Sequence, residues 1–191
     1  ATTMLNRKHT ARATAYTSVA KWLHWTMAAL VAAMLLNGWS LDNYEGGALS
    51  AALSHHALGG FFVASLCGLR YLWRTSHPPP ELPVTSSRPQ VIAAKVIHTT
   101  FYILMIVVPV TGIMTAVAHD VPVVVLGVID LQDTFSFFGP DNSDLKRFIH
   151  AQTMHTFAGL IISHIGAALV HQFWVKDGLL RRILWEKSND S

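Results

Sequence analysis

Four long stretches without a formal charge divide this chain. Each stretch holds between 20 and 28 residues and is bounded by charged residues or by short polar segments. A helix needs about 20 apolar residues to cross the hydrocarbon core of a bilayer. We therefore predict an all-α fold, an integral membrane four-helix bundle that forms a single domain over residues 1–191. The predicted helices cover approximately 18–41, 48–73, 91–118 and 148–175.

The connections between these helices differ in kind. The second connection reads S-H-P-P-P-E-L-P-V-T-S-S-R-P, and its prolines exclude a helix. The third connection, 120–147, is the longest. Its apolar core, V-P-V-V-V-L-G-V-I, is too short to span a bilayer, so we expect it to lie at the membrane interface.

Basic residues predict the orientation. The N-terminal tail, the proline-rich connector with its flanks and the C-terminal tail hold twelve of the fourteen Lys and Arg residues, whereas the other two connections hold seven of the eleven acids. The positive-inside rule then predicts that both termini are cytoplasmic. The composition agrees with a membrane protein, because only 13% of residues are charged and the mean hydropathy is +0.36. Topology accounts for the net charge of +3, so a nucleic-acid partner is not indicated.

Histidines inside the apolar stretches indicate the chemistry. The fourth predicted helix carries His150, His155, His164 and His171. An imidazole in hydrocarbon is costly unless it is bonded, and a metal centre is one partner that several histidines can share. His150 and His164 lie within about 40° of one helix face but roughly 21 Å apart along the axis. This spacing suits two separate centres at two depths.

The other helices offer partners at the same two depths. A bis-histidine haem in a four-helix bundle fits this distribution, and the absence of a C-x-x-C-H motif predicts that the haems are held non-covalently. Zinc or copper would need three or four ligands that converge on one point. The axial pairs on offer are His55 or His56 with His150 at the outer face, and His24 with His164 or His171 at the cytoplasmic face.

Four motifs resemble those of the bacterial cytochrome b561 family, whose relatives include the cytochrome b subunits of hydrogenase and formate dehydrogenase. They are K-W-L-H-W in the first helix, H-x-x-x-G from His55 to Gly59, H-T-T-F-Y with V-P-V-T-G in the third helix, and H-I-G-A-A-L-V-H-Q-F-W-V-K-D-G-L-L-R-R at the end of the fourth. The resemblance covers nearly the whole chain. It implies a multi-pass protein of the bacterial inner membrane with two b haems.

The resemblance also selects among the ligands. Carried over by motif, the inner haem falls between His24 and His164, and the outer haem between His55 and His150. Gly59, one turn after His55, would let a flat macrocycle approach the backbone. The local match around His150 is loose, so His155 stays a second candidate for that ligand, as His56 does for His55.

The function implied by the resemblance is transfer of single electrons between the outer face and a quinone near the inner face. His98 and His171 are candidates for the quinone site, and the plainer alternative for each is an interhelical hydrogen bond. The electron donor is either superoxide, which would make the protein a superoxide:ubiquinone oxidoreductase, or a periplasmic redox protein. A third alternative is the cytochrome b membrane subunit of a periplasmic dehydrogenase.

The charges of the outer connections bear on this choice. Their summed charge is acidic and disfavours an anion such as superoxide, although Lys146 and Arg147 would form a local basic mouth beside His150. A rival of another class is a non-redox metal-binding or scaffold protein of the membrane. It would need a polar path or a converging set of ligands, and the sequence shows neither.

Overall fold

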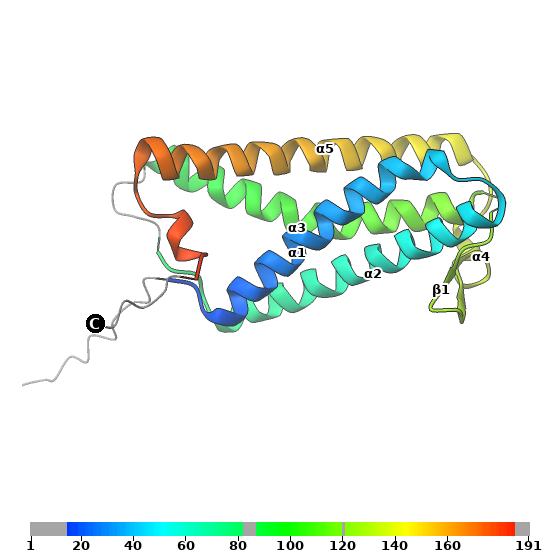
Figure 1. The fold of residues 1–191 in the computed structure, drawn as a ribbon, viewed down its shortest axis with the longest axis horizontal. Coiled ribbons are helices and arrows are strands. Elements are labelled where there is room, and N and C mark those ends of the chain that lie inside the picture. Colours follow the sequence, from blue (N-terminus) through cyan, green and yellow to red (C-terminus); the bar gives the residue numbers. More distant parts are fainter. Residues whose placement is uncertain (1–14, 82–86, 120, 186–191) are drawn as a thin grey trace, which may run out of the picture.

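The computed structural model describes residues 15–81, 87–119 and 121–185, and it is built almost entirely from helices (Figure 1). The predictions for the N-terminal tail and for the middle of the proline-rich connector fall outside these ranges. Four helices are long and apolar enough to cross a membrane, which confirms the predicted all-α fold and agrees with four spans. They are α1 (Ser18–Ser40), α2 (Gly46–Ser76), α3 (Arg88–Val117) and α5 (Ser143–Val170).

Shorter elements occupy the connections. They are η1 (Leu41–Asn43), β1 (Val124–Val125), β2 (Ile129–Asp130), α4 (Leu131–Thr134), η2 (Ser136–Phe138), the π-helical turn η3 (His171–Val175) and η4 (Leu180–Arg182).

The long helices extend beyond the uncharged stretches that predicted them. α5 begins at Ser143, five residues before the predicted start, and its first turns contain charged side chains. α3 begins at Arg88, where the Ser87 N–H donates to Gln90 Oε1 at 2.8 Å and closes a capping box. A charge ends an apolar run but not a helix, because backbone hydrogen bonds continue into the polar region. The predicted ranges were therefore too short at these ends.

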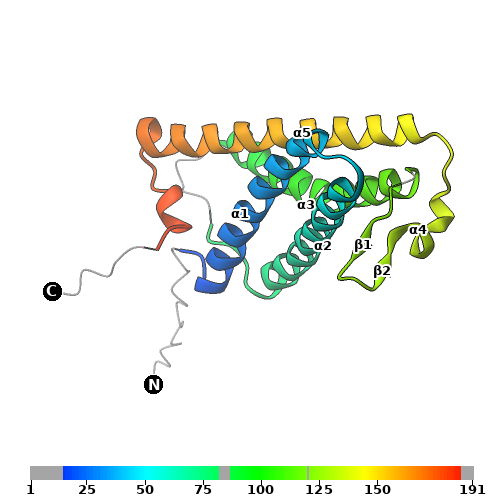
Figure 2. The ribbon, with the colours of Figure 1, turned by 45° about the vertical axis from the view of Figure 1, so that its right-hand side comes forward.

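The helices do not pack equally against one another. α1 packs on α2, α2 on α3, and α3 along α5. Neither α1 nor α2 makes a contact of comparable extent with α5 in the part of the chain that the structure describes. Figures 1 and 2 both show α1 and α2 diverging from α5 toward the end at which α1 begins. The bundle is therefore open between α5 and the pair α1–α2.

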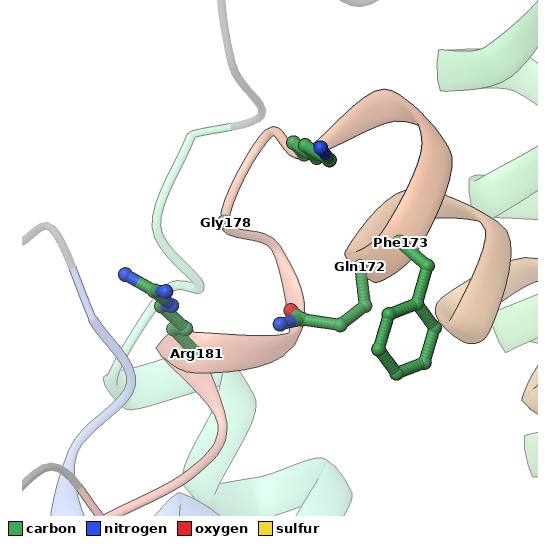
Figure 3. Close-up of a pocket in the computed structure, with 5 residues that line it drawn as sticks. Gln172, Phe173, Gly178 and Arg181 are labelled. Carbon is green, nitrogen blue, oxygen red and sulfur yellow. The ribbon is translucent and has the colours of Figure 1, made fainter.

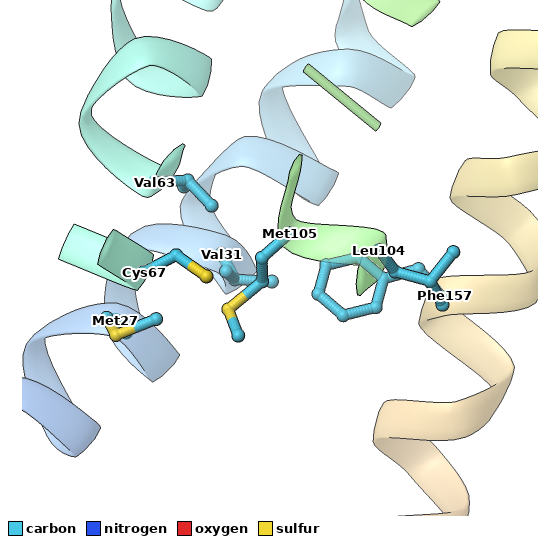
Figure 4. Packing of buried hydrophobic residues seen from close by; sticks show 7 residues of the cluster. All are labelled: Met27, Val31, Val63, Cys67, Leu104, Met105 and Phe157. Carbon is cyan, nitrogen blue, oxygen red and sulfur yellow. The ribbon is translucent and has the colours of Figure 1, made fainter. Parts of the chain in front are cut away.

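The apolar core lies near the middle of the helices. Every long helix supplies at least one buried side chain to this core, and the one from α5 is Phe157 (Figure 4). The cluster consists of Met27, Val31, Val63, Cys67, Leu104, Met105 and Phe157.

A small second cluster closes the end formed by the third connection. β1 and β2 form an antiparallel hairpin in which Val124 pairs with Asp130. Val123, Val125 and Leu131 are buried there and pack against the first half of α2. The apolar core of this connection is therefore a hairpin that covers one end of the bundle, and its place at the membrane interface stays a prediction.

The start of α1 and the last described residues meet at the opposite end. The Tyr16 N–H donates to the Arg182 carbonyl at 3.1 Å. Lys21 Nζ donates to the Leu184 carbonyl at 2.6 Å, and Trp25 Nε1 donates to the Ile183 carbonyl at 3.1 Å. The two ends of the described chain thus lie on the same side, as four crossings require. Which side of the membrane this is stays a prediction.

Candidate functional site

Two imidazoles face each other near the end covered by the hairpin. The ring centroids of His56 on α2 and His150 on α5 lie 6.5 Å apart, with their planes at 88°. His55 is exposed. Successive helical residues point about 100° apart, so only one of two adjacent histidines can face the bundle. The predicted partnership of His55 with His150 is therefore not the one that the structure brings together.

The facing imidazoles have a separation that suits one metal between them. With a metal–nitrogen bond of about 2 Å on each side, two imidazoles that share one metal have centroids roughly 6 Å apart. His56 Nδ1 lies 3.0 Å from Asn37 Oδ1 on α1, and His150 Nδ1 lies 3.1 Å from Thr111 Oγ1 on α3. Hydrogen bonds to the described residues therefore occupy Nδ1 of both rings and leave Nε2 of both available. This geometry fits an axial ligand pair.

Glycines give both rings the space they occupy. A Cβ at Gly38 would lie 3.3 Å from His56 Cε1, and a Cβ at Gly112 would lie 3.2 Å from His150 Cε1. Both distances are shorter than ordinary contacts. The edge of each imidazole therefore rests against the backbone of a neighbouring helix. Asn37 and Thr111 were not predicted from the sequence, although each is a polar residue followed directly by glycine within an apolar stretch.

Gly59 has a different surrounding from the one predicted. It is buried, and a Cβ at this position would collide with Met34 Sδ of α1. Small residues at such positions allow membrane helices to approach closely. The structure thus gives Gly59 a role in packing α1 against α2, in place of the predicted role beside a macrocycle.

Three histidines gather toward the other end of the bundle. The rings of His98 on α3 and His164 on α5 lie 5.7 Å apart with their planes at 74°. His24 on α1 lies close enough to both of these rings for their charges to interact. The predicted ligands His24 and His164 are thus in one group, which His98 joins. No set of three metal-ligating side chains that could hold an ion occurs among the described residues.

Arg70 on α2 lies beside this group of three histidines. It is within electrostatic range of His24, His98 and His164, and its Nη1 lies 3.5 Å from the Ala20 carbonyl. A guanidinium in this position can also bind a carboxylate. It therefore offers an anchor for an acidic group next to these three imidazoles.

The two groups of histidines are separated by the apolar core. Phe157 is buried and lies seven residues from both His150 and His164 along α5 (Figure 4). Seven residues correspond to about two helical turns. The two groups of histidines therefore lie at different levels along the bundle. His155 also lies on α5 but is exposed.

His171 lies two turns beyond His164, where α5 passes into the π-helical turn η3. Its Nδ1 is 2.6 Å from Asp177 Oδ2, and the Asp177 side chain is 7% exposed. Residues of η3 and of the segment that follows it line a surface hollow of about 320 Å³ (Figure 3). The hollow is lined by Gln172, Phe173, Lys176, Gly178 and Arg181.

The two basic residues before His150 have partners in the protein. Lys146 Nζ donates to the carbonyls of Phe138 and Gly139 at 2.8 and 2.6 Å. Arg147 Nη2 lies 3.5 Å from Asp42 Oδ1. Both cations therefore have partners in the connections, and neither is an unpartnered cation beside His56 and His150.

Comparison with known proteins points to the same family as the sequence motifs do. The profile of the family described as prokaryotic cytochrome b561 matches residues 15–186. Cytochrome b561 homolog 2 of Escherichia coli strain K12 is 30% identical over 171 residues, which cover 87% of this chain and 89% of that protein. Cytochrome b561 homolog 1 of the same strain is 28% identical over 172 residues, covering 85% and 93%. With these matches, four membrane-length helices and paired imidazoles between them, the chain belongs to the prokaryotic cytochrome b561 family of membrane proteins.

Proposed function

We propose that this protein binds two non-covalent b haems and passes single electrons across the bacterial inner membrane between a periplasmic donor and a quinone. The facing imidazoles of His56 and His150 carry the proposal. Family membership implies b-type haem, and each haem, when bound, supplies one-electron iron redox chemistry at its depth. His56 and His150 would hold the outer haem, and His24 and His164 the inner haem.

The packing of the helices supports this assignment. Each proposed ligand pair joins α5 to α1 or to α2, and these are the helices that do not pack closely against α5. The pairs therefore span the open part of the bundle. The apolar cluster around Phe157 lies between the two levels and keeps water out of the region that separates them.

The quinone is proposed to bind at the end that carries His171. The Asp177 carboxylate holds the imidazole, and residues 172–181 of the same segment line a surface hollow with an amide, an aromatic ring and two cationic side chains. A histidine can bond a quinone carbonyl and move a proton to it. His98 is the second candidate. Its contact with His164 favours a place beside the inner haem, whereas His171 directly precedes the segment that lines the surface hollow.

The donor is proposed to be a periplasmic redox protein, with superoxide as the alternative. An acidic outer surface suits a basic protein partner, and Lys146 and Arg147 are engaged with neighbouring groups. Replacing both by Ala tests the alternative. If superoxide is the donor, its consumption slows more than haem reduction from the quinol side. Equal effects on both rates count against a basic mouth.

A haem count tests the ligand assignment. Pyridine haemochrome analysis of detergent-purified protein should give two haems per chain, and His56→Ala and His24→Ala should each retain one. His55→Ala is the matched control for His56 and should retain two. His98→Ala should also retain two, whereas loss of a haem there, with none lost from His24→Ala, would reassign the inner pair to His98 and His164. Well-folded protein without haem would overturn the proposal.

A further inference from the structure

Asn37 and Thr111 make the same kind of contact, each with Nδ1 of one of the two imidazoles, His56 and His150. Asn37 lies against His56, Thr111 lies against His150, and each is followed by the glycine on which the same ring rests. Thr111 is 8% exposed, and among the residues that the structure describes it is the one buried polar residue. A buried hydroxyl at this depth is costly unless its hydrogen-bonding capacity is used.

The hydroxyl proton of Thr111 is already committed. It is donated to the Val108 carbonyl in the same helix, at 2.9 Å. A threonine hydroxyl has one proton to donate and two lone pairs to accept with. The 3.1 Å contact with His150 Nδ1 is therefore one in which the ring N–H donates and Thr111 Oγ1 accepts.

The neighbouring Thr153 does not alter this assignment. Its Oγ1 lies 3.5 Å from Thr111 Oγ1, and its own proton is directed to backbone carbonyls of α5, with Ile149 O at 2.7 Å. No donor among these hydroxyls is left for His150 Nδ1. The proton of the His150 ring thus lies on Nδ1.

The same reasoning applies to His56. The contact atom of Asn37 is its amide oxygen Oδ1, which only accepts. His56 Nδ1 must then donate across the 3.0 Å contact, and its proton also lies on Nδ1. Both rings consequently present an unprotonated Nε2, the form in which a neutral imidazole binds a metal.

We propose that Asn37 and Thr111 are positioning residues for the outer haem. They hold His56 and His150 in the Nδ1–H tautomer, direct both Nε2 atoms to one iron, and increase the electron donation of the two imidazoles to it. The proposal rests on the proposed function, since it requires a haem between these histidines. Histidine ligands of metals usually donate their other N–H to such an acceptor, and losing it typically weakens metal binding about 10- to 100-fold.

Apolar replacements of similar size test the proposal. Asn37→Leu and Thr111→Val remove the acceptors, alone and together. Thr111→Ser keeps the hydroxyl and should behave as the wild type. Thr115→Val is the matched control, because the Thr115 hydroxyl donates at 2.9 Å to the Thr111 carbonyl within its own helix. The outer-haem signal is the one that His56→Ala removes, and the inner-haem spectrum reports whether each variant is folded.

Two readouts distinguish positioning from simple packing. Potentiometry should show that each single replacement lowers the preference of the outer site for ferric over ferrous haem, and a tenfold loss raises the midpoint by about 59 mV. In the double variant, transfer of the outer haem to apomyoglobin should be about 10- to 100-fold more favourable. The low-spin electron paramagnetic resonance signal of the outer haem should shift, because its g values report the electron donation of the axial imidazoles.

The outcomes separate this proposal from the one on which it rests. If Asn37→Leu and Thr111→Val keep the wild-type midpoint and g values while His56→Ala loses a haem, the positioning role is wrong and the haem site stands. If Thr115→Val shifts the midpoint as much as Thr111→Val does, the effect is one of packing and the proposal is again overturned. Retention of both haems by His56→Ala would remove the site itself.

Discussion

Gly112→Ala is a small change aimed at one ligand of the proposed outer haem. The new Cβ would lie 3.2 Å from His150 Cε1, whereas ordinary contacts begin at 3.4 Å, so the ring must move by about 0.2 Å or more. The ring cannot retreat freely, because its Nδ1 is bonded to Thr111 Oγ1. Metal–ligand distances tolerate about 0.2 Å. The substitution should therefore weaken the outer haem site and leave the inner one intact.

The size of the effect follows from the cost of overpacking. Adding a methyl group to a well-packed site costs about 1–3 kcal/mol. If that strain falls on the haem-bound state, haem retention weakens roughly 5- to 150-fold, since about 1.4 kcal/mol corresponds to a factor of ten. Gly112→Val adds two further methyl groups and should abolish the outer haem. Loss should appear as a fall from two haems per chain toward one.

Haem titration of the purified variants measures this effect, and Gly68→Ala is the control. A Cβ at Gly68 on α2 meets nothing within 4 Å. Alanine is better than glycine inside a helix by about 0.5–1 kcal/mol, so the control should bind both haems and be at least as stable as the wild type. Equal retention of the outer haem by Gly112→Ala and Gly68→Ala would refute the reasoning.

Gly59→Leu should lower the thermal midpoint by about 2–12 °C, because the new side chain collides with Met34. Gly68→Leu is the control and should leave the midpoint unchanged. Equal midpoints of the two variants in a thermal unfolding assay would show that α1 and α2 do not meet at Gly59. Asp177→Asn should slow quinone reduction severalfold with two haems retained, because the amide is a weaker acceptor than the carboxylate that holds His171. An unchanged rate in stopped-flow measurements would exclude this hydrogen-bonded pair from the quinone site. A C-terminal green fluorescent protein should fluoresce in cells and a C-terminal alkaline phosphatase should be inactive; the opposite pair of results would invert the predicted orientation.

The fold could be predicted from the sequence because bilayer thickness sets a length that uncharged stretches must match. Helix ends were predicted less well. α5 begins among charged residues that a hydropathy criterion excludes, although its backbone bonding continues through them.

The pairing of His56 with His150 shows where prediction from sequence ends. His55 and His56 are each followed four residues later by a glycine, so the H-x-x-x-G motif occurs twice in overlapping form. One residue changes the direction of a side chain by about 100°, and only the rotation of α2 against its neighbours decides which ring faces α5. That rotation depends on contacts such as Gly59 with Met34, which link residues far apart in the sequence. The acceptors Asn37 and Thr111 were missed for the same reason.

The contact between the start of α1 and the end of the described chain has a consequence for biosynthesis. Lys21 and Trp25 bond carbonyls that lie 163 and 158 residues later in the chain. At a synthesis rate of about 5–20 residues per second, α1 waits roughly 8–32 s for these partners. α1 is synthesised before the other three long helices, yet the contacts at its start are thus completed after theirs. A chain that ends before Ile183 would have four inserted helices, but Lys21 and Trp25 of α1 would lack these hydrogen-bond acceptors. Quality-control proteases could recognise such a chain.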